Sequence, residues 1–425
     1  MYLGNLSHTS FAANETQINR DTVAQLLQIW KINAGATIST GVTAAGGSLF
    51  FGDWEGNFYS VDAATGAIRW TAFLGKAPSA ANEVCMPGIG VASQAAVDED
   101  TVYAAGGDSV VYALNRDTGE VRWQVPLADP QSGSYLWSSA MLSNRVLYVG
   151  IASLGDCPTV RGGLARIPVD DPSSTQIQYF MPPGGEGAGL WSTPAVDEPA
   201  NLVYVTTGNA SSQDPQYGVW GSALLALDAT TLEIQAYFLL PITEEEDDAD
   251  WGSSPVLFET VDGAQYVAAN GKNGVMYVLS RPDLSPVWSY KMAIDCDSPT
   301  QGCGSVSTPA FDGNLLFSGA GQSDQDSGTL GTVTGFDAAA QSALWTYAAR
   351  GAVLAPVTVT PGLVFVPTLK GLAILDASSG SELWSDSTTK ALYGQVVVSN
   401  GVLYATYANG DVVAWALAAA RHLVH

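Results

Sequence analysis

Histidine and positive charge are scarce in this sequence. Its 425 residues contain three histidines, His8, His422 and His425, all in the terminal segments. A Ser-His-Asp triad, a histidine general base and a histidine-ligated metal are therefore not expected in the body of the chain. Lysine and arginine number 16 against 41 aspartates and glutamates, which gives a net charge of −25. Without a basic surface to neutralise phosphates, neither nucleic acid nor an anionic membrane surface is an expected partner.

Long apolar runs and haem-attachment motifs are also missing. No run approaches the roughly 20 apolar residues of a membrane-spanning helix, and no C-x-x-C-H motif is present. Of the four cysteines, Cys296 and Cys303 flank a short loop and can close a small ring, whereas Cys85 and Cys157 fall in neighbouring repeats and can join them. Because disulfides persist only in oxidising compartments, these pairings predict a periplasmic or secreted protein. Four buried free thiols in a cytosolic protein are the alternative.

The dominant feature of the sequence is a repeat. Its clearest copy runs from Asn57 to Trp70: a short apolar strand, an aspartate, a Thr-Gly turn and a second strand closed by tryptophan. Related copies end at Trp123 and Trp384, and less regular ones end at Tyr237, Trp288 and Trp345. One such unit cannot bury its apolar face alone, so a period of roughly 40–50 residues indicates a solenoid or a propeller. Short strands with glycine-rich turns favour an all-β propeller.

The two ends of the chain complete one repeat between them. Residues 22–33 contain a strand with Trp30 but no partner strands, and residues 395–416 contain three strands without a closing tryptophan. We therefore expect an eight-bladed β-propeller with tryptophan-docking repeats, closed where the segment around Trp30 pairs with Val412–Trp415. The expected domains are an N-terminal extension (1–21), a single propeller (22–417) and a C-terminal tail (418–425).

Two loops and an acidic run interrupt the repeat. The loops are Leu154–Gly163 and Gly208–Gly221, and the acidic run ends at Asp250, just before Trp251. Insertions in propeller loops gather on one face, which is usually the binding face. A charge run is most often a solvated loop, and we interpret residues 244–246 in that way. Asp248 and Asp250 differ because they lie against the start of an apolar strand.

Three features together resemble the quinoprotein alcohol dehydrogenases: the tryptophan-closed repeat, the opening segment Thr16–Trp30, and the blade from Thr206-Thr207-Gly208-Asn209 to Asp250. Members of that family are eight-bladed propellers that hold pyrroloquinoline quinone (PQQ) with a calcium ion near the ring axis. The resemblance covers essentially the whole propeller, and the Cys157…Arg161-Gly162 pattern is similar to the polyvinyl alcohol dehydrogenase-like members. The repeat by itself is shared with non-catalytic propellers, including an outer-membrane assembly lipoprotein.

The resemblance implies a set of site residues. Trp191 corresponds to the indole that stacks on the quinone, and Lys272 to the cation that contacts the quinone oxygens. Asn209 corresponds to a calcium ligand, in keeping with the preference of calcium for oxygen. Asp248 corresponds to the general base and is also a candidate metal ligand, with Asp250 in its place if the register shifts by two residues.

The chain departs from the family pattern at several positions. Cys157 stands where the family has a calcium-binding glutamate, and the adjacent Asp156 is a candidate substitute. Ile89 stands near the position of an arginine that binds the cofactor carboxylates. Arg161, Cys85 and Cys157 are the further candidates for contact with the cofactor.

Two functions from different classes follow. The first is PQQ- and Ca²⁺-dependent oxidation of a small-molecule or polymeric alcohol, with electrons passed to an external acceptor because the chain carries no haem motif. The second is a propeller that keeps the fold without the cofactor and serves as a binding or assembly scaffold. Under the second hypothesis Trp191 is a packing residue, like Trp137 in the preceding repeat, while Asn209 and Lys272 are ordinary turn residues.

Overall fold

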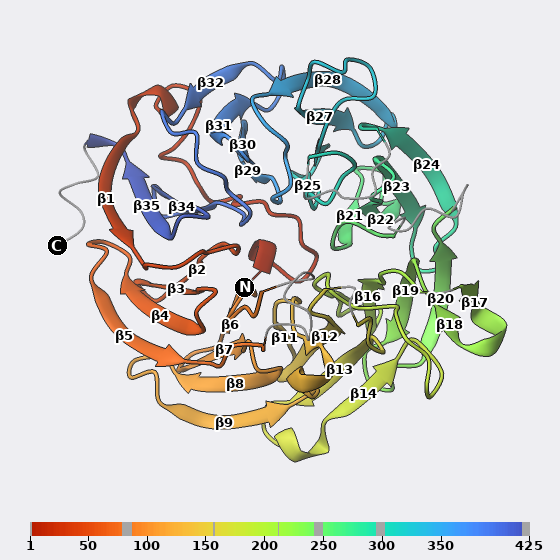
Figure 1. Ribbon diagram of the computed structural model, residues 1–425. Coiled ribbons are helices and arrows are strands. Elements are labelled where there is room, and N and C mark those ends of the chain that lie inside the picture. Colours follow the sequence, from red (N-terminus) through yellow and green to blue (C-terminus); the bar gives the residue numbers. More distant parts are fainter. Residues whose placement is uncertain are drawn as a thin grey trace.

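The computed structural model describes residues 2–78, 87–155, 158–210, 212–241, 250–294 and 302–418. Eight antiparallel sheets of four principal strands follow one another around a central axis, as Figure 1 shows. The expected eight-bladed β-propeller is confirmed. No helix in the described ranges is long and apolar enough to cross a membrane.

Each blade begins at the axis and ends at the rim. The strands of blades 1 to 4 are β2 (Thr43–Ala45), β3 (Ser48–Gly52), β4 (Asn57–Asp62), β5 (Ile68–Phe73); β6 (Ala96–Val97), β7 (Thr101–Ala105), β8 (Val110–Asn115), β9 (Val121–Pro126); β11 (Met141–Ser143), β12 (Val146–Ser153), β13 (Gly163–Pro168), β14 (Gln176–Tyr179); and β15 (Ala195–Asp197), β16 (Leu202–Thr206), β19 (Ala223–Asp228), β20 (Ile234–Leu239). Those of blades 5 to 8 are β21 (Val256–Glu259), β22 (Gln265–Asn270), β23 (Val275–Ser280), β24 (Pro286–Lys291); β25 (Ala310–Phe311), β26 (Leu315–Ala320), β27 (Gly331–Asp337), β28 (Ser342–Ala349); β29 (Thr358–Thr360), β30 (Leu363–Thr368), β31 (Gly371–Asp376), β32 (Glu382–Ser385); and β33 (Val397–Ser399), β34 (Val402–Thr406), β35 (Asp411–Ala416), β1 (Leu27–Asn33).

The remaining elements are short. Strand β10 (Ser134–Tyr135) extends blade 3, and β17 (Gln213–Asp214) pairs with β18 (Val219–Trp220) in a hairpin outside blade 4. The 3₁₀ turns are η1 (Tyr2–Gly4), η2 (Val23–Gln25), η3 (Pro130–Ser132), η4 (Pro172–Ser174) and η5 (Pro215–Tyr217).

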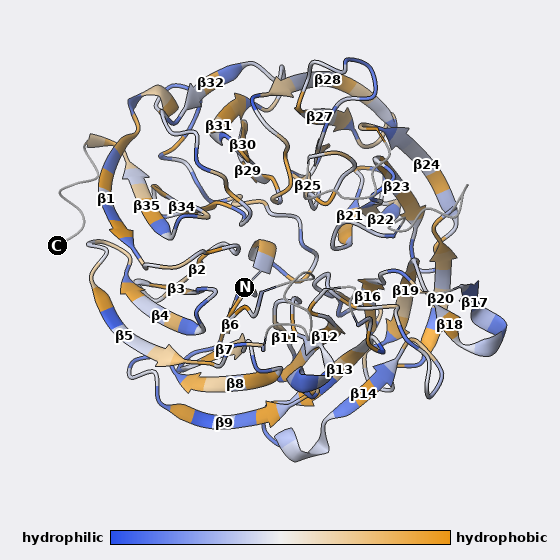
Figure 2. Cartoon of the chain, in the orientation of Figure 1, coloured by the Kyte–Doolittle hydropathy of each residue, from blue (hydrophilic) through white to orange (hydrophobic). Residues whose placement is uncertain are grey.

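Burial differs between inner and outer strands. Strands β3, β7 and β16 are buried at every position because both of their faces pack against neighbouring blades. The outer strands β5 and β9 alternate hydrophilic and hydrophobic residues along their length, as Figure 2 shows. One face of each outer strand therefore contacts solvent, which is typical of antiparallel sheets.

Tryptophans of the outer strands join neighbouring blades. The Trp70 indole N–H donates to the carbonyl of Arg116 (2.8 Å), in the turn between the outer two strands of blade 2. A Cβ on Gly119 of the same turn would lie 2.6 Å from the Trp70 ring, so the ring packs directly on glycine backbone. The Trp30 indole N–H makes the same kind of hydrogen bond to the carbonyl of Ala63, in the turn of blade 1 (3.0 Å). The Trp345 indole N–H likewise donates to the carbonyl of Ala377 in blade 7 (3.0 Å).

The ring closes between β1 and β35, as expected. The two strands are antiparallel, with Trp30 opposite Ala414. Lys31 of β1 lies 2.8 Å from the buried carboxylate of Asp411 in β35, and Lys390 contacts the same group. The first strand in the chain thus completes the last blade, so that this sheet gains its outer strand.

The start of the segment that precedes β1, at the end marked N, lies at the centre of the ring, as Figure 1 shows. Carbonyl oxygens of this segment accept hydrogen bonds from the innermost strands of four successive blades. These bonds are Val196 N to Leu6 O (2.8 Å), Leu257 N to Ser7 O (2.8 Å), Phe311 N to Thr9 O (2.9 Å) and Val359 N to Ser10 O (2.9 Å). Residues 6–10, which lie within the expected N-terminal extension, are therefore hydrogen-bonded to the inner strands of the propeller.

Candidate functional site

Four of the predicted site residues come from equivalent positions in blades 4 and 5. Trp191 precedes the innermost strand of blade 4 (β15), and Asp250 precedes that of blade 5 (β21). Asn209 follows the second strand of blade 4 (β16), and Lys272 follows that of blade 5 (β22). Because these loops lie at the same end of the ring, the fold brings the four residues together.

An ion pair lies at the centre of this cluster. The Lys272 Nζ atom is 2.7 Å from Asp250 Oδ1, and the two side chains are 12% and 4% exposed. The backbone N–H of Asn209 donates to Asp250 Oδ2 (3.0 Å), and the backbone N–H of Lys272 donates to the Asp250 carbonyl (2.9 Å). Both carboxylate oxygens are thereby fixed, one by an ammonium and one by an amide.

The Trp191 indole lies against this ion pair. Lys272 Nζ is 5.3 Å from the centroid of the Trp191 ring, a cation–π distance. Gly208 lies between the Trp191 indole and the Asp250 carboxylate. A Cβ at this position would lie 3.0 Å from Asp250 Oδ2 and 3.5 Å from Trp191 Cδ1. A larger residue at this position would therefore require the Asp250 carboxylate to shift by a few tenths of an ångström.

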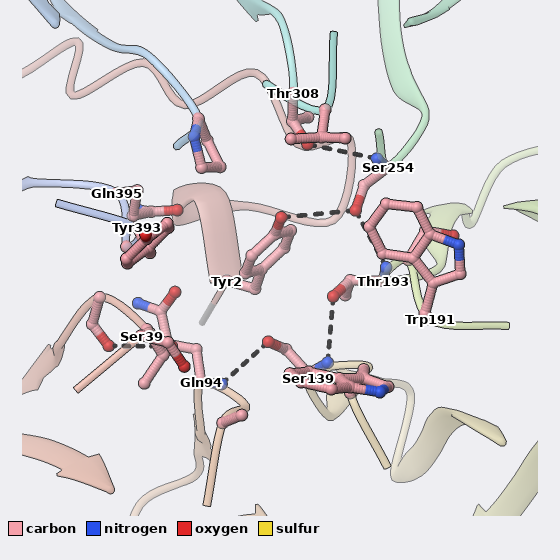
Figure 3. Close-up of a pocket in the computed structure, with 18 of the residues that line it drawn as sticks. Tyr2, Ser39, Gln94, Ser139, Trp191, Thr193, Ser254, Thr308, Tyr393 and Gln395 are labelled. Atoms are coloured by element: carbon pink, nitrogen blue, oxygen red, sulfur yellow. Dashed lines mark hydrogen bonds between the residues drawn. The ribbon is translucent and has the colours of Figure 1, made fainter. Parts of the chain in front are cut away.

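Trp191 also borders a pocket on the ring axis. This axial pocket has a volume of about 220 Å³. Its lining includes Trp137, Gln94 and Tyr2 and comes from all eight blades and the N-terminal segment. Figure 3 shows the Tyr2 ring in the middle of the pocket, with its hydroxyl 3.4 Å from Ser254 Oγ. Burial raises the pKa of the Tyr2 phenol, so the group is neutral.

Arg161 is not brought into the cluster. Its backbone is bridged to Gly187, which in turn is bridged to Ala210, beside Asn209. Its guanidinium nevertheless lies 4.0 Å from the Tyr179 ring centroid, and Nε donates to the Met181 carbonyl (2.7 Å). This side chain borders a separate groove next to blade 3.

The other predicted residues Cys85, Asp156, Cys157 and Asp248 lie outside the described residues, as does Cys296. Cys303 is described and is not a free thiol. Both cysteine pairings remain predictions.

The described residues offer contacts for a planar ring and a part of a metal-ligand set. The flat Trp191 indole can stack on a planar ring, and the Lys272 cation can contact negatively polarised oxygens on that ring. Calcium takes six to eight oxygen ligands. Within the described ranges, however, no three histidine, cysteine, aspartate or glutamate side chains are grouped to hold a metal. Asn209 and Asp250 supply side-chain oxygens, and the remaining acidic candidates, Asp156 and Asp248, lie outside those ranges.

Sequence reasoning missed the polar lining of the axial pocket. Ser139, Thr193, Ser254 and Thr308 each stand just before the innermost strand of a blade, and the last three are followed by proline. This repeated Ser/Thr position is a sequence signal that could have indicated a lining of hydroxyl groups along the axis.

The chain belongs to the PQQ-repeat β-propeller family. A family model described as outer membrane protein assembly factor BamB matches residues 27–153 and 329–422, which is more than half of the chain. A second model, described as glucose/ethanol/alcohol dehydrogenase, beta-propeller domain, matches residues 181–312, which contain the whole cluster.

Individual relatives carry dehydrogenase names. The chain is 24% identical to a polyvinylalcohol dehydrogenase of Pseudomonas sp. over 61% of its own length and 46% of the relative. It is 25% identical to a putative dehydrogenase XoxF of Paracoccus denitrificans over 86% of its length and 66% of the relative. The chain thus spans between about half and two thirds of these relatives. A europium-containing methanol dehydrogenase shares the fold, with a TM-score of 0.80, 17% identity, and coverage of 98% of this chain and 97% of that one.

Proposed function

We propose that this propeller binds PQQ together with a metal ion and oxidises an alcohol to an aldehyde or ketone, passing electrons to an external acceptor. The observation that carries the proposal is the cluster in which Lys272 contacts both Asp250 and the Trp191 ring. Dehydrogenase names among the relatives and the match of the alcohol dehydrogenase family model to residues 181–312 support it.

The chain's own residues would divide the work as follows. Trp191 offers a flat apolar face for the ring of the cofactor, and Lys272 offers a cation for its oxygens. When bound, the quinone supplies the acceptor for the hydride that leaves the alcohol carbon. Asn209 offers a side-chain oxygen to a metal ion, either calcium or a lanthanide. Asp156 and Asp248 are candidates for its remaining ligands.

Asp250 is our candidate for the base that takes the alcohol's hydroxyl proton. The ammonium of Lys272 and the backbone N–H of Asn209 hold the Asp250 carboxylate in a fixed orientation beside the Trp191 ring. A carboxylate accepts a proton when it acts as a general base. Asp248, which the resemblance put first, remains the alternative base.

Replacement of Asp250 tests this role. We expect Asp250→Asn to reduce alcohol-dependent dye reduction by a factor of about 100 or more, because an amide cannot accept the proton. A matched control is Asp197→Asn, which breaks another mostly buried ion pair, Arg281 Nη1 to Asp197 Oδ2 at 2.6 Å, outside the cluster. Both proteins are first loaded with PQQ and with Ca²⁺ or a lanthanide. Dye reduction is then measured with each alcohol of a panel. Full activity of Asp250→Asn would exclude Asp250 as the base.

A scaffold function is the second candidate, and one observation favours it. The family model that matches more than half of the chain is described as an assembly factor. A scaffold needs no cofactor, so a wild-type protein that neither binds PQQ nor reduces dye in any of these assays would favour this function.

We also propose a periplasmic or secreted location, for which the four cysteines are the support. The proposal predicts no reactive thiol in the unreduced, denatured protein, and four reactive thiols would contradict it.

A further inference from the structure

The axial pocket is an uncharged cavity in a strongly acidic protein. The chain has a net charge of −25, yet none of the described residues that line the pocket carries a charge. Its volume of about 220 Å³ equals roughly seven waters at the volume of liquid water. A charged ligand would lose its hydration there without gaining a counter-charge, so the lining favours a small neutral one.

Hydroxyl groups form a partial belt around the pocket. Backbone N–H groups donate from each blade to the next, Gln94 N to Ser139 Oγ (2.9 Å) and Ser139 N to Thr193 Oγ1 (3.0 Å). The belt continues from Thr193 N to Ser254 Oγ (2.9 Å) and from Ser254 N to Thr308 Oγ1 (3.2 Å). A hydroxyl that accepts a bond still has a proton to donate. The Ser139 and Thr193 hydroxyls donate to no acceptor among the described residues, so their protons remain available to a ligand.

Gln94 adds an acceptor to these donors. Its side chain is 1% exposed, and its amide nitrogen donates to the carbonyl of Val42 (2.5 Å), which fixes the orientation of the amide. Within the described part of the chain, Gln94 Oε1 has no hydrogen-bond partner. A buried amide oxygen without a partner is unfavourable, so this atom indicates a donor that arrives with a ligand.

We propose that the axial pocket binds a small neutral polyol of roughly three to six carbon atoms. Hydroxyl groups of such a ligand can both accept from Ser139 and Thr193 and donate to Gln94. Its C–H faces can pack on the indoles of Trp137 and Trp191, which also border the pocket. Figure 3 shows Gln94, Ser139, Thr193 and Trp191 arranged around the space beside Tyr2. The proposal goes beyond the proposed oxidation and does not depend on it, because the pocket needs no cofactor to be formed.

Two ligands with the same number of carbon atoms test the proposal on the unaltered protein. Isothermal titration calorimetry of the full chain, without added PQQ or metal, compares erythritol with butan-1-ol. We expect erythritol to bind at least tenfold more tightly, because only it can satisfy both the donors and the acceptor. Equal affinities, or no heat with erythritol, would overturn the proposal and leave a pocket that holds water only.

Variants locate the binding site. Gln94→Leu and Thr193→Val should each weaken erythritol binding at least tenfold, since each removes one polar partner. Thr360→Val is the matched control, because Thr360 is fully buried, its hydroxyl has no partner among the described residues, and it does not line the pocket. Unchanged binding by a folded Gln94→Leu would overturn the assignment. If a variant does not fold, the comparison of the two ligands on the wild type still decides.

Discussion

His8 shows how a single residue of the N-terminal segment is built into the core. Its side chain is fully buried, and Nδ1 contacts the carbonyl of Pro255 at 2.9 Å. Its φ of 60° is left-handed, a conformation that histidine adopts more readily than most residues. Burial lowers the pKa of His8 to about 3, so the ring is neutral in the folded protein.

This burial predicts a pH dependence of stability. In the unfolded chain His8 takes up a proton below a pKa of about 6.5, whereas in the folded protein it does so only near 3. The unfolded state therefore binds more protons in this interval, and the free energy of unfolding falls as the pH is lowered. Between about pH 6.5 and pH 5, the loss should be about 1.5 kcal/mol. Urea unfolding of the wild type and of His8→Asn, which tolerates the same φ, measures this.

The His8→Asn variant should lack this contribution to the pH dependence of the free energy of unfolding. It retains His422 and His425, so the difference from the wild type reports on His8 alone. A variant whose unfolding free energy falls as steeply as that of the wild type would show that His8 is not the titrating group.

At the scale of the element, the turn after each aspartate carries the contact between blades. Asp62 Oδ1 accepts from the backbone N–H groups of Ala64 and Thr65 (3.0 and 2.9 Å), which fixes the turn. Gly66 then meets the ring of Trp30, with a Cβ position 2.9 Å from that ring. The aspartate, the glycine and the tryptophan of the repeat therefore form one unit across two blades.

Two glycines with nearly the same backbone conformation isolate the contribution of this docking. Gly119 has φ +75° and a Cβ position 2.6 Å from the Trp70 ring, whereas Gly47 has φ +74° and open space around its Cβ position. Gly47→Ala should lower the free energy of unfolding by about 1–2 kcal/mol through backbone strain alone. Gly119→Ala should lower it by a further ~1–3 kcal/mol because the Trp70 ring must move.

Chemical denaturation measures both variants. Equal losses for Gly47→Ala and Gly119→Ala would mean that the tryptophan contact contributes little to stability.

Local signals explain why the blades were predictable and the axial region was not. The aspartate, Thr-Gly turn and tryptophan of each repeat are neighbours in sequence, and Trp30 marked the missing outer strand of blade 8. The path of residues 3–15 depends instead on backbone carbonyls such as those of Ser7 and Thr9, which leave no side-chain pattern. The choice between Asp248 and Asp250 depends on the path of the loop before β21, and the structure places Asp250 beside Lys272.

At the scale of the whole molecule, the ring depends on its first residues. Carbonyl groups of residues 6–10 accept hydrogen bonds from the innermost strands of blades 4 to 7. Strand β1 supplies the outer strand of blade 8. Asp411 pairs with Lys31 in this closure, and its hydrogen bonds with Asn33 and with the lysines hold its pKa well below the usual range against the effect of burial.

Removal of residues 2–33 should therefore yield an insoluble protein or one that melts at a much lower temperature, because an unpaired edge and an open axis are exposed to solvent. Thermal unfolding followed by circular dichroism, with the full chain as the control, measures the effect. A truncated protein that melts like the full chain would contradict closure by the N-terminal strand.

The most direct test of the account is a PQQ titration of the full chain with Ca²⁺ or a lanthanide, followed by absorbance and equilibrium dialysis. We expect one PQQ per chain, and Lys272→Met and Trp191→Ala should each weaken binding about tenfold or more through loss of the cation and of the stacking face. Lys370→Met, at the corresponding position after β30 in blade 7, should bind PQQ like the wild type. Absence of binding by the wild type, or equal binding by Lys272→Met and Lys370→Met, would contradict the assignment of the cluster as the cofactor site.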